Sequence, residues 1–275
     1  MMRNKIIRTS VVIISFIGLL SACNLWGNNM RLNDFFDSES VKLLQTIQSH
    51  DEQRAKTLIK KGLTLNFHGN DGITPLFWLI MQDDKIALKL ALELGADPNF
   101  PSEDGRQPVA SVAGGNDDDI LELLLEYGGN PNAVNLDGKP ALFLAIGHER
   151  MSQIKLLKRY GADINITDRR NSSALLHAAT LNKYEIADYF IEAGADYTIR
   201  DASGADVAWE VYDKLDRNLL SPQYSAYDWA VKVKEKLQNR GVQFPPPSPR
   251  EIRIQEGRPN RWDKEAMEKE RRLQQ

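Results

Sequence analysis

The sequence predicts an all-α protein built as a solenoid, in which short helical repeats stack side by side. Five glycines lie at a constant interval of 33 residues along the 275-residue chain. These are Gly62, Gly95, Gly128, Gly161 and Gly194. A constant interval of this size is typical of repeat arrays, whose core is buried between neighbouring repeats. Such arrays leave a long surface exposed, so the interval favours recognition over chemistry.

Two short sequences recur around these glycines and predict the local structure of each repeat. A Gly-Ala-Asp or related word begins at the glycine, as in residues 95–99 and 161–165. About a dozen residues later a turn precedes a helix start, as in residues 71–76, 104–109 and 137–142. Glycine can adopt the left-handed conformation that ends a helix, and Asp-Gly favours a tight reversal. Each repeat should therefore contain a turn and two helices.

These words resemble the ankyrin repeat family, in which a hairpin-like turn is followed by two antiparallel helices. The resemblance covers about residues 38–241 and implies five registered repeats and a modified C-terminal cap. The units lie near 38–70, 71–103, 104–136, 137–169, 170–202 and 203–241. The family's usual His is replaced by Phe77, Ala110, Phe143 and Leu176. We therefore expect apolar packing in place of that residue's hydrogen bonds, and turns that are held less rigidly.

The outer helices are expected to carry the core. An apolar residue stands four positions before each glycine of the ladder. These residues are Leu58, Ala91, Leu124, Leu157 and Phe190. Their register places them against the neighbouring repeats.

The sixth unit departs from the period. The glycine expected at position 227 is instead Gly241, which indicates an insertion around residues 213–227. Ser221-Pro222 is expected to restart a helix with Tyr224, Tyr227, Val231 and Leu237 on one face. The insertion either marks a binding surface or is an ordinary surface loop. The Pro-rich linker and charged tail at 242–275 are either disordered or fold on a partner, and Trp262 favours the second.

The N-terminus carries the features of a bacterial lipoprotein signal peptide, residues 1–22. Basic residues precede an apolar run, Val11 to Leu20, that is shorter than a membrane-spanning helix needs. The run ends in Leu-Ser-Ala-Cys, which resembles the lipobox and implies lipidation of Cys23, followed by a spacer at 23–37. The alternative is an incidental thiol beside an ordinary cleavage site. The resemblance predicts a lipid-anchored protein of the bacterial envelope that faces the periplasm. Asn24 favours the outer over the inner membrane.

Composition and motifs argue against nucleic-acid binding and against catalysis. Without residues 1–22 the chain has 32 Lys and Arg against 38 Asp and Glu, a mildly acidic balance that disfavours phosphate backbones. No phosphate loop, nucleophile elbow or metal-ligand spacing is present. His177 is interpreted as a packed helix residue, and the run Asp117–Asp119 as a helix cap rather than a calcium site. No enzyme activity, metal or cofactor is expected.

The turn tips and the ends of the inner helices are predicted to line one concave face that binds a protein partner. Acidic residues gather in the early tips and basic ones at residues 169 and 170, a gradient that would orient a partner. The alternative is a solvated surface that needs charge for solubility. The predicted binding residues are Asn70, Asp71, Ile73, Met81, Glu103, Asp104, Arg106, Asp137, Lys139, His148, Arg169 and Arg170.

The combination of an ankyrin-like array with a lipid anchor resembles immunity lipoproteins that accompany antibacterial type VI secretion effectors. The resemblance implies that the partner is a secreted phospholipase toxin, which the array covers. The alternative is a periplasmic scaffold or stress-protection factor that holds an endogenous envelope protein.

Overall fold

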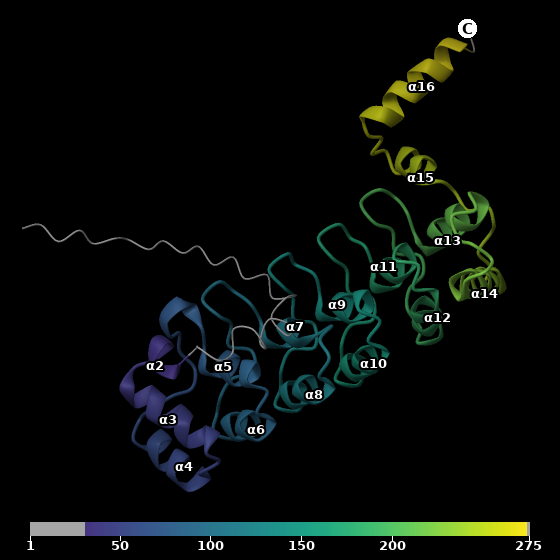
Figure 1. Cartoon of the computed structure of the whole chain (residues 1–275). Coiled ribbons are helices and arrows are strands. Elements are labelled where there is room, and N and C mark those ends of the chain that lie inside the picture. Colours follow the sequence, from purple (N-terminus) through teal and green to yellow (C-terminus); the bar gives the residue numbers. More distant parts are fainter. Residues whose placement is uncertain (1–30, 274–275) are drawn as a thin grey trace, which may run out of the picture.

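The protein is an elongated stack of helix pairs that runs from left to right in Figure 1, with two further helices projecting from its C-terminal end. The computed structural model describes residues 31–273. The helices are α2 (Leu32–Phe35), α3 (Ser38–Gln48), α4 (Glu52–Lys60), the 3₁₀ helix η2 (Asn70–Gly72), α5 (Pro75–Gln82), α6 (Lys85–Glu93), α7 (Pro108–Val112), α8 (Asp118–Glu126), α9 (Ala141–Gly147), α10 (Met151–Arg159), α11 (Ala174–Thr180), α12 (Tyr184–Glu192), α13 (Val207–Asp216), α14 (Ser225–Asn239), α15 (Pro249–Gln255) and α16 (Arg261–Leu273). The predicted all-α solenoid is confirmed.

The helices form two layers. The inner layer is α3, α5, α7, α9, α11 and α13, and the outer layer is α4, α6, α8, α10, α12 and α14. Helices contact their partner within the repeat and helices of neighbouring repeats, as α11 does with α12 and with α9 and α13. Within residues 31–273, no helix is both long enough and apolar enough to cross a membrane.

The glycine ladder ends the outer helices. The five glycines at the 33-residue interval have φ angles between 87° and 98°, in the left-handed region that glycine tolerates. Gly241 adopts the same conformation after α14, with φ 89°. The displaced glycine of the sixth unit therefore ends its helix in the same way as the other five.

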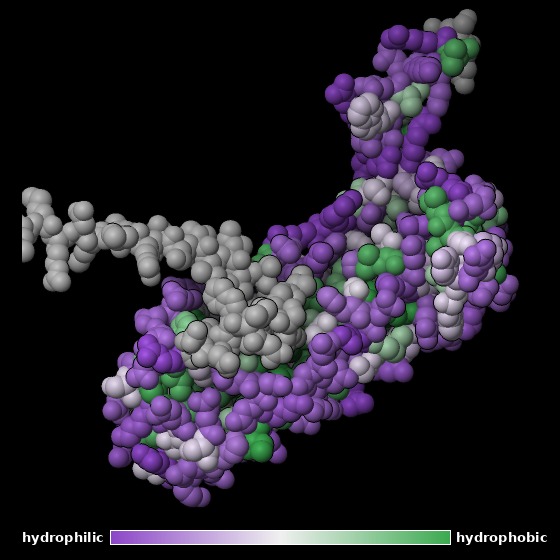
Figure 2. Space-filling model, viewed as in Figure 1, coloured by the Kyte–Doolittle hydropathy of each residue, from purple (hydrophilic) through white to green (hydrophobic). Residues whose placement is uncertain are grey.

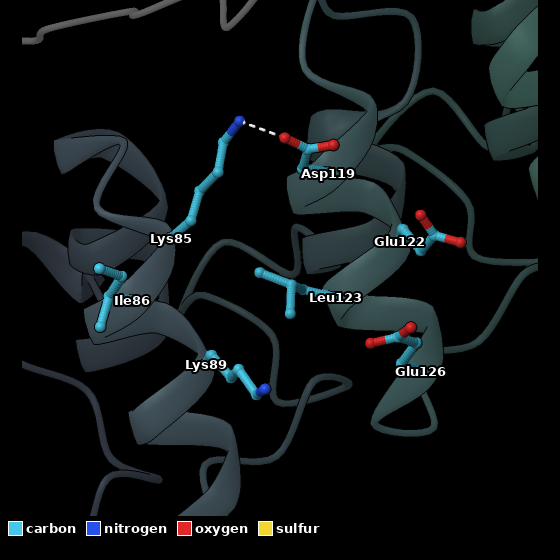
Figure 3. A pocket seen from close by; sticks show the side chains of 7 residues that line it. All are labelled: Lys85, Ile86, Lys89, Asp119, Glu122, Leu123 and Glu126. Atoms are coloured by element: carbon cyan, nitrogen blue, oxygen red, sulfur yellow. Dashed lines mark hydrogen bonds and ion pairs between the residues drawn. The ribbon is translucent and has the colours of Figure 1, made fainter. Parts of the chain in front are cut away.

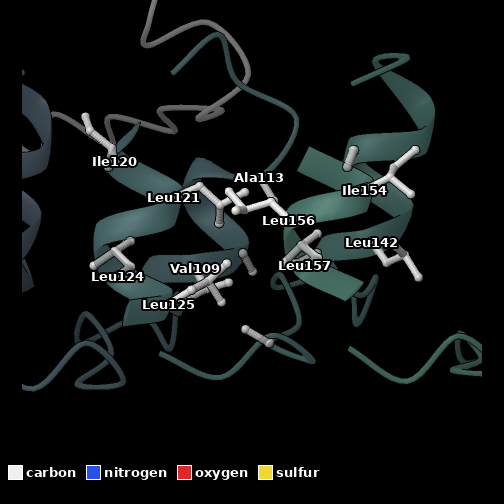
Figure 4. Packing of buried hydrophobic residues seen from close by; sticks show 14 of the residues in the cluster. Val109, Ala113, Ile120, Leu121, Leu124, Leu125, Leu142, Ile154, Leu156 and Leu157 are labelled. Atoms are coloured by element: carbon white, nitrogen blue, oxygen red, sulfur yellow. The ribbon is translucent and has the colours of Figure 1, made fainter. Parts of the chain in front are cut away.

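The core lies between the two layers and runs through the array. The five residues four positions before the ladder glycines are each 6% exposed or less, as expected. Figure 4 shows this packing where α7 and α8 meet α9 and α10, with Leu121, Leu124 and Leu157 among the labelled side chains. Each repeat thus buries apolar surface that it could not bury alone.

An asparagine ladder ties the repeats together beside the glycines. Asn99 accepts a hydrogen bond from the Asn130 amide at 2.7 Å and donates to the Gly128 carbonyl at 2.9 Å. The same acceptor role recurs at the 33-residue interval. It is played by Asn66, Asn99, Asn132 and Asn165. The next position in the ladder is Thr198, and there the regular array gives way to the cap.

The folded array begins before the expected boundary at residue 38. The spacer was expected to extend to residue 37, but Leu32 and Phe36 are buried in the core. The ring of Phe36 meets the indole of Trp78 edge-on, with centroids 6.2 Å apart. These apolar side chains cover the first repeat, so at least residues 32–36 belong to the domain. Cys23 and the rest of the spacer lie outside the described residues.

The insertion of the sixth unit lengthens α13 and adds a loop at 217–224 before α14. The predicted apolar face of α14 is wrong at two positions, since Tyr224 is 70% exposed and Val231 is only half-buried. The buried stripe is Ala230, Val233 and Leu237. The helix begins at Ser225, later than Ser221-Pro222 predicted, and its contacts with α12 and α13 bury a different set of side chains.

The tail is helical rather than disordered. Arg253 of α15 and Asp263 of α16 form a bidentate ion pair with both contacts at 2.7 Å, and Asp263 is 3% exposed. Ile252 is buried against the turn at Gly204. The tail therefore docks on the sixth unit of its own chain through α15, while α16 projects outward with a mostly hydrophilic surface (Figures 1 and 2).

Candidate binding surface

Five turns project from the inner layer and share one backbone hydrogen bond. In each, the amide of the first residue donates to the carbonyl of the fifth at 2.8 to 3.0 Å. The turns are residues 69–73, 102–106, 135–139, 168–172 and 201–205. The left-handed position that Gly105 and Gly138 occupy in their turns is filled by Asn171 in the fourth. Asparagine tolerates that conformation, so the weakened copy keeps the shape of the turn.

The turns keep internal hydrogen bonds although the family's usual His is absent. Asn135 accepts from the amides of Asp137 and Lys139 at 3.0 and 2.9 Å. Asp168 accepts from those of Arg170 and Ser172 at 2.8 and 2.9 Å. The equivalent side chains are Ser102, Asn135, Asp168 and Asp201. Sequence reasoning missed them, although their 33-residue interval was readable.

Neighbouring tips contact one another. The Glu103 amide donates to the Gly72 carbonyl at 3.0 Å, joining the first and second turns. The Ala202 amide donates to the Arg170 carbonyl at 2.7 Å, joining the fourth and fifth. Between the third and fourth, Arg169 lies so close to Gly138 that a Cβ there would be 2.4 Å from its Nε. Between the second and third, a Cβ at Gly105 would lie 4.0 Å from a methyl carbon of Leu136. The tips therefore form one continuous row, which we call the tip row.

The predicted site residues of the tip row differ in how free they are to bind. Asp71, Glu103, Asp137, Lys139 and Arg170 are exposed. Several others are already engaged within the chain. Asn70 donates to the Asp34 carbonyl, Asp104 pairs with Arg106 at 2.7 Å, Arg169 reaches the Leu136 carbonyl at 3.4 Å, and Ile73 and Met81 pack against the core.

In the tip row, the charged side chains that form no ion pair are separated by sign along the array. Carboxylates stand free at the first three tips, whereas Arg170 at the fourth forms no ion pair with any residue between 31 and 273. Arg106 is held by Asp104, whose pKa lies below its usual value. Burial opposes the ionised form, but hydrogen bonds from Ser102 and the charge of Arg106 outweigh it. Lys139 is also exposed and forms no ion pair with a described residue, but it shares the third tip with Asp137, so the expected gradient depends chiefly on Arg170.

The C-terminal ends of the inner helices form a second row, at Gln82, Gly115, His148 and Leu181, which we call the helix-end row. At its centre α7 stops early, because residues 113–115 leave the helix. Gln153 of α10 is fully buried and closes this end, accepting from the Gly114 amide at 2.7 Å and donating to the Gly115 carbonyl at 3.2 Å. Its equivalents in α6, α8 and α12 are apolar, so sequence comparison between repeats could have identified it.

The groups that could suggest chemistry have structural roles. His177 is half-buried and stacks on Phe143 with ring centroids 4.6 Å apart, and burial lowers its pKa. Asp117 caps α8, accepting from the amides of Asp119 and Ile120. Among the described residues, no three His, Cys, Asp or Glu side chains gather where they could hold a metal ion.

A groove of about 520 Å³ lies on the outer face between α6 and α8 (Figure 3). Lys85 crosses it to Asp119, with Nζ and the carboxylate 2.6 Å apart. A second contact joins Lys85 to Asp117 at 3.0 Å. These ion pairs link successive repeats, so the groove is a seam of the array rather than a cavity for a substrate.

Comparison with known proteins supports the fold. Residues 108–201 match the family model described as ankyrin repeats (3 copies). The ankyrin repeat domain of Bcl-3, a member of the IkappaB protein family, superposes with a TM-score of 0.60 at 20% identity, covering 76% of this chain and 92% of that one. An ankyrin repeat domain from Acinetobacter baumannii AYE gives 0.59 at 20% identity, covering 74% and 100%. No curated protein matched the sequence.

Proposed function

We propose that this protein is a non-enzymatic, lipid-anchored binding protein on the periplasmic side of the bacterial envelope. Its ankyrin repeats support the binding role, because such repeats imply binding to proteins. Its partner is an antibacterial phospholipase delivered by a type VI secretion system, which it neutralises as an immunity protein. The observation that carries the binding role is the continuous tip row with its separated free charges. A rigid row of this kind can cover the active site of an enzyme without an enzymatic function of its own.

The position of the anchor supports a partner that works at a membrane. Seven residues separate Cys23 from Arg31. Fully extended, such a segment spans at most about 25 Å. Acyl chains on Cys23 would therefore hold the first repeats close to the lipid surface. A phospholipase acts on that same surface, so the anchor would keep the binder where the toxin attacks.

The binding surface is tested by reversing Arg170, an exposed cation of the fourth tip that forms no ion pair within residues 31–273. We expect Arg170→Glu to weaken capture of the partner roughly tenfold or more, because it repels the carboxylates that the gradient would select. Lys155→Glu is the matched control, since Lys155 is exposed on the outer helix α10 and forms no ion pair within the described chain. Equal affinity of both variants and the parent would remove the tip row as the site.

The identity of the partner is tested by capture and by protection. The lipidated protein is used as bait and the bound proteins are identified by mass spectrometry. Recovery of a secreted lipase, together with greater sensitivity of deletion cells to kin attack, would support immunity. Recovery of an endogenous envelope protein with unchanged sensitivity would replace immunity by the scaffold or stress-protection role.

A further inference from the structure

The loop of the sixth unit forms an apolar hollow at the end of the helix-end row. Its volume is about 300 Å³, the lower limit of the range in which protein pockets hold a ligand. Leu219, Leu220 and Ala226 provide apolar surface, and the lining is completed by Asn182, Ser221, Tyr224 and Tyr227. The hollow exists because the insertion places residues 217–224 beside the end of α11. It is therefore a product of the departure from the 33-residue period.

Exposed apolar side chains gather at this hollow. Leu219 is 51% exposed and Tyr224 is 70% exposed, and both line it. Leu181, the residue before Asn182, is 39% exposed. Large apolar side chains left in water beside a concave site are typical of interaction surfaces. Since Leu181 also belongs to the helix-end row, the hollow continues the face that the repeats present.

The free charge around the hollow is negative. Asp216 ends α13 just before the loop, and Asp228 lies in the first turn of α14, one helical turn after Tyr224. Both carboxylates are exposed and neither forms an ion pair with a described residue. The nearby cations are already paired, Lys183 with Glu149 and Arg217 with Asp213. An occupant that brings positive charge would therefore find partners there.

We propose that this hollow receives an apolar anchor side chain of the protein partner, flanked in that partner by basic residues. The apolar lining takes the anchor, and Asp216 and Asp228 attract the flanking charges. Asn182 and Ser221 offer polar groups to the backbone beside the anchor. This inference rests on the proposed binding function and assigns the anchor point of the same face to the inserted loop.

The chemistry is tested with short peptides as probes. A capped pentapeptide with one Phe between two Lys is titrated into the isotopically labelled chain lacking residues 1–30, and amide shifts are followed by NMR. We expect saturable shifts at Asn182, Ser221 and Ala226. Replacing the Phe by Ser, or both Lys by Glu, should weaken binding roughly tenfold. Equal binding of the three peptides, or shifts confined to other residues, would overturn the proposal.

Two variants locate the binding on the protein. Leu219→Ser with Tyr224→Ser removes apolar surface that is already exposed, so folding is preserved, and Ile86→Ser on the outer face is the control at a 63% exposed residue. Asp228→Lys should lose the Lys-flanked peptide, whereas Glu235→Lys on the same helix should retain it. Loss of a dimer in the loop variant, seen by light scattering, would instead assign the hollow to a second copy of the chain.

Failure of this inference is distinguishable from failure of the proposed function. If Arg170→Glu weakens capture of the partner while the loop variant captures it normally, the tip row binds and the hollow does not. If neither change affects capture, the binding face itself is misassigned.

Discussion

Gln153 offers the sharpest test of how the array tolerates its irregular third repeat. The equivalent residues of the neighbouring repeats are Ala87, Ile120 and Ile186, all buried and apolar. Gln153 is polar because α7 stops early and leaves backbone groups of residues 114 and 115 without helical partners. We expect Gln153→Met, which keeps the length of the side chain, to destabilise the protein.

The size of this destabilisation follows from the two hydrogen bonds that Gln153 makes. The Gly114 amide is buried and would lose its acceptor at 2.7 Å, which costs roughly 1–3 kcal/mol. The longer bond to the Gly115 carbonyl contributes less, and the more apolar side chain offsets part of the loss. The expected decrease in the free energy of unfolding is therefore about 2 kcal/mol, or close to a thirtyfold change in the equilibrium constant.

Urea unfolding followed by circular dichroism measures the change, with Gln82→Met as the control at an exposed position of α5. Amide hydrogen exchange at Gly114 shows whether the loss of stability is local to this site, since array proteins can open repeat by repeat. A decrease below about 0.5 kcal/mol, with unchanged protection at Gly114, would refute the assignment of Gln153 as the closing residue.

Two further predictions concern the joints of the array. Asn99→Ala removes one rung of the asparagine ladder and should lower the free energy of unfolding by about 1–2 kcal/mol. The control is Asn239→Ala at an exposed position of α14, and an equal effect of both changes would contradict the ladder. The tail should undock in acid, because hydrogen bonding to Arg253 lowers the pKa of Asp263 to about 2. Its contribution to docking is present above the unfolded pKa near 4 and is lost as the pH falls through about 2, which loss of amide protection in α16 would report. The Asp263→Asn variant should lack protection at neutral pH as well, and protected amides in that variant would count against the pair.

The local structure of each repeat could be predicted because its signals are local. A ladder glycine must end a helix wherever it falls, and the core residue four positions earlier follows from helical geometry. The positions of the turns could be predicted for the same reason, because their signals are also local. Asp117 was expected to cap α8 and does so. Each of these features depends on residues within one or two turns of the chain.

The ends of the array could not be predicted in the same way. Phe36 is buried only because Trp78, 42 residues later, lies beside it. The tail forms helices on its own domain because Arg253 meets Asp263 and reaches the Ser203 carbonyl. The face of α14 depends on where the inserted loop lets the helix begin. Nothing in the local pattern of these segments specifies their partners.

The sequence by itself determined the period, the class of fold, the helix ends and most of the core, because those follow from residues that are close in the chain and recur. Only the tertiary structure decided which charges are free. It paired Lys85 with Asp119, laid Arg169 over Gly138 and left Arg170 open. It also brought Asn182 and Tyr224 together at one hollow. The physical reason is that ion pairs and hollows are made by residues from different repeats, whose approach depends on how the repeats stack.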